Sequence, residues 1–267
     1  MIDAARIELN GRPASAEDLR PLIQSNYGHF TAFEARAGRV QGFALHLERL
    51  VRGTRTLFGS DLDPERLRAC VRQAIGSDAA LSVRVNVFSR AFDRELPGAA
   101  AEPDILVIVA PAKPRSAAPA RLKSFRYGRE LPDVKHVGTF PLFHFRARAQ
   151  QAGFDDALFA GADGRIAEAS VWNLGFLDGD GVVWPDAPQL RGVGQELLAR
   201  GMQRLGVPQS RRAIGLGDVA AFRGAFVTNA MVPVRAVAAI DDIAFAIDEA
   251  TLALLRRCRD DNPWEPV

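Results

Sequence analysis

The chain has 267 residues, of which 48% are hydrophobic and 25% are charged, a composition typical of globular proteins. This length allows one large domain or two modest ones. The formal net charge of +2 does not indicate a nucleic-acid partner, because the arginines are dispersed among acidic residues instead of forming a basic patch.

Cysteine usage and hydropathy indicate the compartment. Cys70 and Cys258 lie far apart and form no metal-binding spacing, so free thiols in a reducing compartment are expected. The sequence has no uninterrupted apolar stretch of about 18 residues and no signal-peptide pattern at its N-terminus. We therefore expect a soluble cytoplasmic protein with no metal site and no membrane partner.

The first part of the chain predicts a small α/β domain over residues 1–112. Ser15 has the character of a helix cap, and Ala37-Gly38 separates two strand-like runs as in a hairpin. The helices after this hairpin carry apolar residues at helical spacing, and the last strand is a continuous apolar run typical of a buried strand. In chain order we expect a strand at 5–13, a helix at 15–23, strands at 29–36 and 39–45, helices at 45–59 and 63–76, and strands at 80–88 and 104–111.

The second part of the chain differs in composition and in its pattern of predicted elements. Residues 111–120 are rich in Pro, Ala and basic residues, which predicts an interdomain linker at residues 113–122. Short strands broken by Gly/Asp turns then predict a larger β-barrel-like domain with peripheral helices over residues 123–267. We expect helices at 140–153, 193–206 and 248–260, and strands within 155–161, 162–168, 173–185 and 225–237.

Lysine is nearly absent, since the chain has 31 arginines and only three lysines. An ammonium group can lose its proton and condense with a carbonyl, whereas a guanidinium cannot. Lys113 lies in the predicted linker and Lys123 in the strand that leaves it, but Lys135 stands in the segment ELPDVKHVGTF. Lys135 is therefore a candidate Schiff-base lysine, although a few lysines also survive by chance in an arginine-rich chain.

Four segments in order, residues 30–50, 134–136 with 152–177, 189–198, and 226–234, resemble the class IV aminotransferases. These are the fold-type IV pyridoxal-phosphate enzymes, which include branched-chain and D-amino acid aminotransferases and aminodeoxychorismate lyase. The resemblance implies an α/β (α+β) fold of two domains with pyridoxal 5'-phosphate between them. It also implies a homodimer, because such enzymes complete each pocket with a loop from a neighbouring subunit.

The resemblance assigns roles to three residues. Lys135 matches the lysine that forms the Schiff base with the cofactor. Glu168, five residues before Asn173, matches the acid that keeps the pyridine nitrogen protonated and the ring an effective electron sink. Arg49 matches the arginine that binds the cofactor phosphate with its planar fork. Without the resemblance, Glu168 is more simply a solvated strand-end residue and Arg49 an exposed helix residue.

Backbone groups complete the expected cofactor site. Gly192, Val193 and Gly194 open a helix, whose N-terminus favours an anion. Asn229 and Ala230 match a second phosphate-contacting turn. Arg84 matches an arginine that handles the substrate carboxylate in branched-chain aminotransferases, with a solvent-facing strand residue as the competing interpretation. The full set of implied substrate-binding residues is Tyr27, His29, Phe30, Arg84, Thr228 and Met231.

Several positions depart from the family pattern. Relatives carry an aromatic residue at the position of Gly175, a basic residue at Gln195 and a tyrosine at Phe140. Ala32 replaces the second threonine of the lyase, although the lysine segment VKH resembles the lyase. These differences favour a divergent branch.

We therefore expect ping-pong transamination of an amino acid with a 2-oxo acid through a Lys135 Schiff base. The alternatives are an aminodeoxychorismate lyase-type enzyme and a non-catalytic protein on the aminotransferase scaffold.

Overall fold

The chain divides into two compact units. The computed structural model describes residues 5–77, 80–114, 116, 118–179 and 181–267. The first unit consists of residues 1–114, 134–138 and 263–267, and the second of residues 115–133 and 139–262. Two segments placed after the linker by sequence, 134–138 and 263–267, thus belong to the first unit. The predicted linker 113–122 also differs from the structure, because strand β7 already begins at Ala120.

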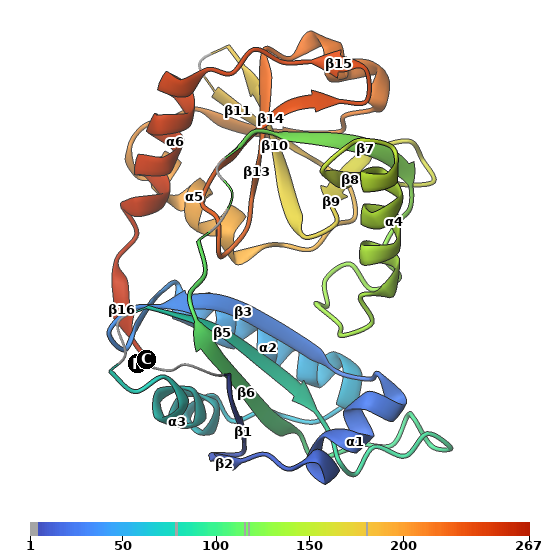
Figure 1. Cartoon of the computed structure of the whole chain (residues 1–267), viewed down its shortest axis with the longest axis vertical. Helices are drawn as coiled ribbons and strands as arrows, with labels where there is room; N and C mark the ends of the chain where they lie inside the picture. Colours follow the sequence, from blue (N-terminus) through green and yellow to red (C-terminus); the bar gives the residue numbers. More distant parts are fainter. Residues whose placement is uncertain (1–4, 78–79, 115, 117, 180) are drawn as a thin grey trace. The chain divides into compact units, whose positions relative to one another are not determined.

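The first unit is an antiparallel sheet covered by helices on both faces (Figure 1). Its strand order is β2-β1-β6-β5-β3. Alternate residues of β6 point to opposite faces: Val107 packs with the α2 and α3 side and Leu106 with the α1 side. The elements are β1 (Arg6–Leu9), β2 (Arg12–Pro13), α1 (Ala16–Ser25), β3 (His29–Ala35), β4 (Arg39–Gln41), α2 (Phe43–Phe58), α3 (Pro64–Ile75), β5 (Leu81–Phe88), β6 (Asp104–Pro111) and β16 (Trp264–Pro266).

The expected hairpin around Ala37-Gly38 is only partly present. Arg36 and Arg39 form the turn, but β4 then pairs with β16 near the C-terminus instead of continuing along β3. Gly42 adopts a left-handed conformation and caps α2, so the helix starts at Phe43, inside the predicted strand 39–45. Phe43 enters the hydrophobic core on the helical face it shares with Leu47, which explains why the strand stops early.

The second unit contains a closed ring of strands. Along the sheet the order is β10-β13-β14-β7-β8-β9, and β9 pairs in turn with β10, which closes the ring. β12 and β11 extend the sheet beyond β10, and β15 pairs with β14. The strands are β7 (Ala120–Arg126), β8 (Asp156–Ala160), β9 (Ile166–Ala169), β10 (Trp172–Asp178), β11 (Gly181–Pro185), β12 (Gln209–Arg212), β13 (Gly224–Thr228), β14 (Arg235–Ile240) and β15 (Ile243–Ala244). The expected barrel-like β domain is therefore confirmed.

Helices surround this ring. α4 (Phe140–Gln151) packs against β7 and β8, while α5 (Val193–Arg204) packs against α6 (Glu249–Asp260). The short helix η1 (Leu216–Ala221) and the strands β12, β15 and β16 were not expected from the sequence. None of the helices in the described part of the chain has the length and apolar composition needed to cross a bilayer.

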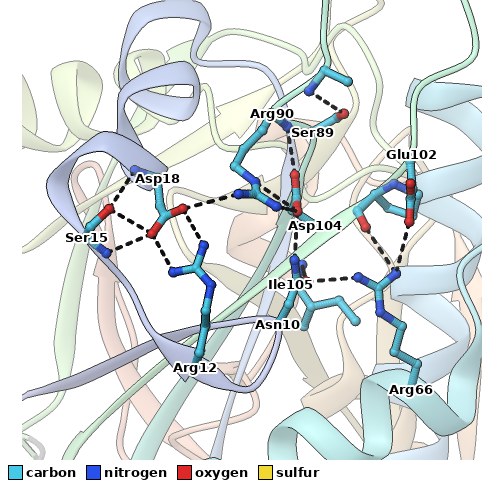
Figure 2. A network of polar contacts seen from close by, with 12 residues as sticks. Asn10, Arg12, Ser15, Asp18, Arg66, Ser89, Arg90, Glu102, Asp104 and Ile105 are labelled. Atoms are coloured by element: carbon cyan, nitrogen blue, oxygen red, sulfur yellow. Dashed lines mark hydrogen bonds and ion pairs between the residues drawn. The ribbon is translucent and has the colours of Figure 1, made fainter.

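An ion-pair cluster fixes the start of the long connection between β5 and β6 (Figure 2). Asp18 in the first turn of α1 accepts hydrogen bonds from Arg12 at 2.7 and 2.8 Å and from the backbone and hydroxyl of Ser15. Arg90 contacts both Asp18 at 3.2 Å and Asp104 at 3.0 Å. These donors, chiefly Arg12 and Ser15, hold the pKa of Asp18 well below its usual value. The cluster therefore joins β2, α1, the residues that follow β5 and the first residue of β6 through charged contacts.

Candidate active site

Lys135 lies beside strand β3 in the first unit. The backbone N–H of Phe30 donates to the Lys135 carbonyl at 2.8 Å, and the N–H of Val137 donates to the Gly28 carbonyl at 2.9 Å. These two hydrogen bonds flank an antiparallel bridge between His29 and His136. Residues 134–138 thus extend the sheet past β3, which fixes the backbone that carries the lysine.

Phe30 brings Lys135 and Arg84 together. The Lys135 Nζ lies 4.8 Å from the centre of the Phe30 ring, and the Arg84 guanidinium carbon lies 3.5 Å from it. The Arg84 Nε donates to Asn86 Oδ1 at 2.9 Å, and burial lowers the pKa of Arg84. The half-buried Arg84 is therefore not a solvent-facing strand residue. A candidate catalytic amine and a candidate carboxylate-binding cation share one aromatic ring.

Arg49 is buried between α2 and β3, with 6% of its surface exposed. It donates to the Thr31 hydroxyl through Nη2, which also lies 3.5 Å from His46 Nδ1. Burial, with repulsion from Arg52, lowers the pKa of Arg49 to about 10. Its Nε has no hydrogen-bond partner within the part of the chain that the structure describes. The interpretation of Arg49 as an exposed helix residue is therefore wrong.

Two predicted substrate residues have their polar atoms engaged inside the first unit. The Tyr27 hydroxyl donates to the Leu57 carbonyl at 2.9 Å, and its ring stacks on Phe92 with 4.4 Å between centroids. His29 Nε2 lies 3.0 Å from Thr54 Oγ1, and burial, with repulsion from Arg49, lowers the His29 pKa to about 3. These contacts give Tyr27 and His29 packing roles in this unit.

Glu168 on β9 is held by an arginine that the sequence analysis missed. Arg129 Nε donates to Glu168 Oε1 at 2.6 Å, and the two side chains are only 3% and 5% exposed. The backbone N–H of Leu190 also points to Oε1 at 3.3 Å. The interpretation of Glu168 as a solvated strand-end residue is therefore wrong. The signal for Arg129 was weak, because its carboxylate partner lies 39 residues away.

Asn173 connects this strand pair to the start of α5. It pairs with Glu168 across β9 and β10, and its side-chain amide donates to the Leu190 carbonyl at 2.8 Å. A Cβ atom built at Gly192 would overlap the Asn173 side-chain oxygen. Asn173, which the resemblance to the family places with Gly192 among the cofactor-binding residues, therefore packs directly against this glycine at the start of α5.

The N-terminus of α5 lies against the turn that follows β13. A Cβ atom at Gly194 would overlap the Asn229 carbonyl group and lie 2.8 Å from the Ala230 nitrogen. Gly192 provides no side-chain cap for the helix. Thr228 Oγ1 and Gln195 Nε2 are buried and lack hydrogen-bond partners among the described residues. A helix N-terminus with unused polar groups nearby is suited to an anion.

Asn229 shapes the same turn, and Met231 follows it. The Asn229 side-chain oxygen accepts from the backbone N–H groups of Met231 at 2.9 Å and Val232 at 2.8 Å. Asn229 therefore organises the turn through its side chain, and Met231 contributes a backbone donor to that fold.

Two departures from the family pattern have structural explanations. A Cβ atom at Gly175 would lie 2.7 Å from Phe226 Cε1 and 3.0 Å from Trp184 Cζ3, so these rings occupy the volume of the aromatic that relatives carry there. Phe140 is 75% exposed at the start of α4 and stacks on His144 at 5.6 Å. Its ring contacts the helix surface, and its side chain has no donor group.

Comparisons with known proteins agree on one family. The sequence model of the amino-transferase class IV family matches residues 28–240. A probable branched-chain-amino-acid aminotransferase of Rickettsia bellii is 25% identical over 146 residues, which are 52% of this chain and 50% of that protein. The match thus spans about half the length of this curated relative.

Solved structures establish the fold. The branched-chain aminotransferase of Thermoproteus uzoniensis with norvaline is 19% identical, with a TM-score of 0.84 over 95% of this chain and 93% of that one. A PLP-bound hypothetical aminotransferase of Mycobacterium tuberculosis is 20% identical, with a TM-score of 0.81 over 96% and 98%. A putative 4-amino-4-deoxychorismate lyase of Legionella pneumophila is 19% identical, with a TM-score of 0.75 over 89% and 93%.

Proposed function

Because the chain belongs to the class IV aminotransferase family, whose cofactor is pyridoxal 5'-phosphate, we propose that it catalyses transamination between an amino acid and a 2-oxo acid. The observation that carries this proposal is the contact of both Lys135 and Arg84 with the Phe30 ring. An amine that can accept a proton lies near a cation that can bind a carboxylate, the two groups that an amino-acid substrate requires.

The described residues fit the cofactor. The buried guanidinium of Arg49, with its unused Nε, suits the phosphate group. Within the second unit, the start of α5 at Gly192, Val193 and Gly194, together with the turn at Asn229 and Ala230, offers backbone donors suited to an anion such as a phosphate. When bound, pyridoxal 5'-phosphate supplies an aldehyde and a protonated ring that delocalises negative charge.

Each side chain then has a defined task. Lys135 would be the residue that holds the cofactor through its aldehyde, and its amine would carry the proton of the substrate Cα. Arg129 donates to Glu168 at 2.6 Å and fixes this buried carboxylate, which would serve the pyridine nitrogen of the cofactor. Arg84 binds the substrate carboxylate with the N–H groups that Asn86 leaves unused.

The first test is the visible absorbance of the purified protein with pyridoxal 5'-phosphate. We expect a yellow, borohydride-reducible chromophore in the wild type and in Lys113→Ala, whose lysine is exposed, but not in Lys135→Ala. Absence of the chromophore in the wild type would favour a non-catalytic scaffold.

A second test separates transferase from lyase. We expect amino-group transfer from an amino acid to a 2-oxo acid, measured with panels of L- and D-amino donors. Pyruvate release from aminodeoxychorismate with no amino acceptor would instead select the lyase, which the likeness to the Legionella protein keeps in view. Light scattering that gives a single 29.0 kDa species would refute the proposed homodimer.

A further inference from the structure

A buried polar strip lies between β3 and α2, and it contains one positive charge. Its five members are between 0% and 6% exposed: His29 and Thr31 from β3, and His46, Arg49 and Thr54 from α2. We propose that Thr31 and His46 are positioning residues that orient Arg49 toward the cofactor phosphate, and that His46 must be neutral for them to do so. This inference rests on the proposed function, in which Arg49 binds that phosphate.

The donors around His46 favour a neutral ring with an acceptor at Nδ1. Arg49 Nη2 can only donate, so Thr31 Oγ1 accepts from it. The Thr31 hydroxyl proton is then available for His46 Nδ1, which lies 2.6 Å away. Arg49 Nη2 also faces Nδ1 from 3.5 Å and can only donate, so in this proposal Nδ1 accepts and the proton of a neutral His46 ring resides on Nε2. Protonation of Nδ1 would remove the acceptor and place a second cation 3.5 Å from Arg49 Nη2.

The second histidine of the strip is neutral because burial, with repulsion from Arg49, lowers the His29 pKa to about 3. Thr54 Oγ1 donates to the Leu50 carbonyl at 2.9 Å, so it accepts from His29 Nε2. A Cβ atom at Gly53 would lie 2.7 Å from His29 Nδ1, which shows how closely α2 approaches this ring. Arg49 is consequently the single charged member of the strip.

Charged groups on the surrounding elements do not neutralise Arg49. No carboxylate lies within ion-pair distance of Arg49 among the residues that the structure describes, because the acids of α2 and β3 are engaged elsewhere. The acids are Glu48, which pairs with Arg52 on α2 at 3.6 Å, and Glu34 on β3, which pairs with Arg36 at 2.6 Å. The other charged groups on the neighbouring elements are cations: Arg84 on β5, Arg68 on α3 over the Phe43 ring, and Lys135 beside β3. A guanidinium stays charged, so the strip requires an anion from outside it.

The geometry gives Thr31 and His46 a directional task. Nη2 of Arg49 is fixed by Thr31, while Nε remains without a partner in the described part of the chain. Thr31 is fixed in turn by His46, so loss of either contact lets the guanidinium rotate. A charged hydrogen bond of this kind is the sort that changes ligand affinity about tenfold or more.

The test measures two affinities by calorimetry on the cofactor-free protein, one for pyridoxal 5'-phosphate and one for pyridoxal, which lacks the phosphate. We expect Thr31→Val to weaken binding of the phosphorylated ligand about tenfold and binding of pyridoxal less than about twofold. The quantity to compare is the ratio of the affinity for pyridoxal 5'-phosphate to the affinity for pyridoxal. Thr31→Ser retains the hydroxyl and should keep the wild-type value of this ratio. Thr54→Val removes a buried hydroxyl of the same strip that does not contact Arg49, and it should leave the ratio unchanged.

His46 is tested in the same way and over a range of pH. His46→Asn places an amide oxygen near the Nδ1 position and should keep the ratio, whereas His46→Leu should lower it as Thr31→Val does. In the wild type the ratio should fall on acidification, and in His46→Asn this fall should be weaker because no imidazole remains at that position.

Two results would overturn the inference: equal ratios in Thr31→Val and Thr31→Ser, or a parallel loss of affinity for both ligands. Failure of the proposed function is recognised separately. A wild type without a borohydride-reducible chromophore contradicts the Schiff-base role of Lys135, whatever the affinity ratio is. A normal chromophore with an unmoved ratio contradicts only the roles of Thr31 and His46.

Discussion

The buried neutral His29 should make the first unit sensitive to mild acid. Its pKa is lowered to about 3, chiefly by burial, whereas an unfolded histidine titrates near about 6.5. Between these two values the unfolded chain binds a proton that the folded chain does not. The free energy of unfolding therefore decreases as the pH falls through this window.

The size of the effect follows from the two pKa values. Integration of the difference in bound protons from pH 6 to pH 4 gives a loss of roughly 2.5 kcal/mol from His29 alone. A glutamine at this position can still donate to Thr54 Oγ1 but cannot titrate. His29→Gln should therefore remove about 2.5 kcal/mol of the pH dependence between pH 6 and 4, whatever it does to stability at pH 7.

The assay is urea unfolding followed by circular dichroism at pH 6, 5 and 4. The free energy of unfolding of the wild type minus that of His29→Gln is the quantity to plot, because the other titrating groups are common to both proteins. His144→Gln, which removes an exposed histidine of α4, is the matched control. Parallel curves for wild type and His29→Gln would show that His29 takes up its proton in the folded state, and would refute the reasoning.

Three further predictions concern other parts of the molecule. Asp18→Asn should lower the free energy of unfolding at neutral pH, and this deficit should shrink below about pH 4, because a carboxyl with a depressed pKa stabilises the fold only above the pKa that it has in the unfolded chain. A deficit of equal size at pH 7 and pH 3 in urea titrations would contradict this. Gly194→Ala should weaken pyridoxal 5'-phosphate binding at least about tenfold in calorimetry, because its Cβ would displace the facing backbone, whereas Gly217→Ala, with no atom within 4 Å of the new Cβ, should bind normally. Arg129→Met should lower the free energy of unfolding by about 3 kcal/mol, because it removes the guanidinium that donates to buried Glu168. A double variant that adds Glu168→Gln should recover part of this loss in thermal unfolding, and no recovery would show that the two residues are not coupled.

Local signals in the sequence predicted most of the helices and the long strands. Gly59 and Gly76 end their helices as expected, and the apolar run of β6 is buried in the sheet. Strand β12 escaped prediction because its four residues are all exposed and carry no apolar alternation. Strand β16 escaped because the strand that it pairs with, β4, lies more than 200 residues earlier in the chain.

In the candidate site, the sequence likewise predicted some residues and missed others. Lys135, Arg49 and Glu168 were identified by a resemblance of whole segments, and the structure shows the latter two buried in polar networks. The partners within those networks were not predicted, because they come from separate elements. Thr31 meets the His46 ring across a strand and a helix, at a spacing that no motif records.

The pairing of β4 with β16 has a consequence for biosynthesis. A ribosome that has just made β4 must add more than 200 further residues before β16 exists, which takes roughly 10–45 s at ordinary rates of translation. During that interval the nascent chain exposes the open edge of β4, and until residues 134–138 are made it also exposes the edge of β3. Unpaired strand edges invite association with other chains. The first unit thus gains its last strand only when Trp264–Pro266 have been made, long after β4.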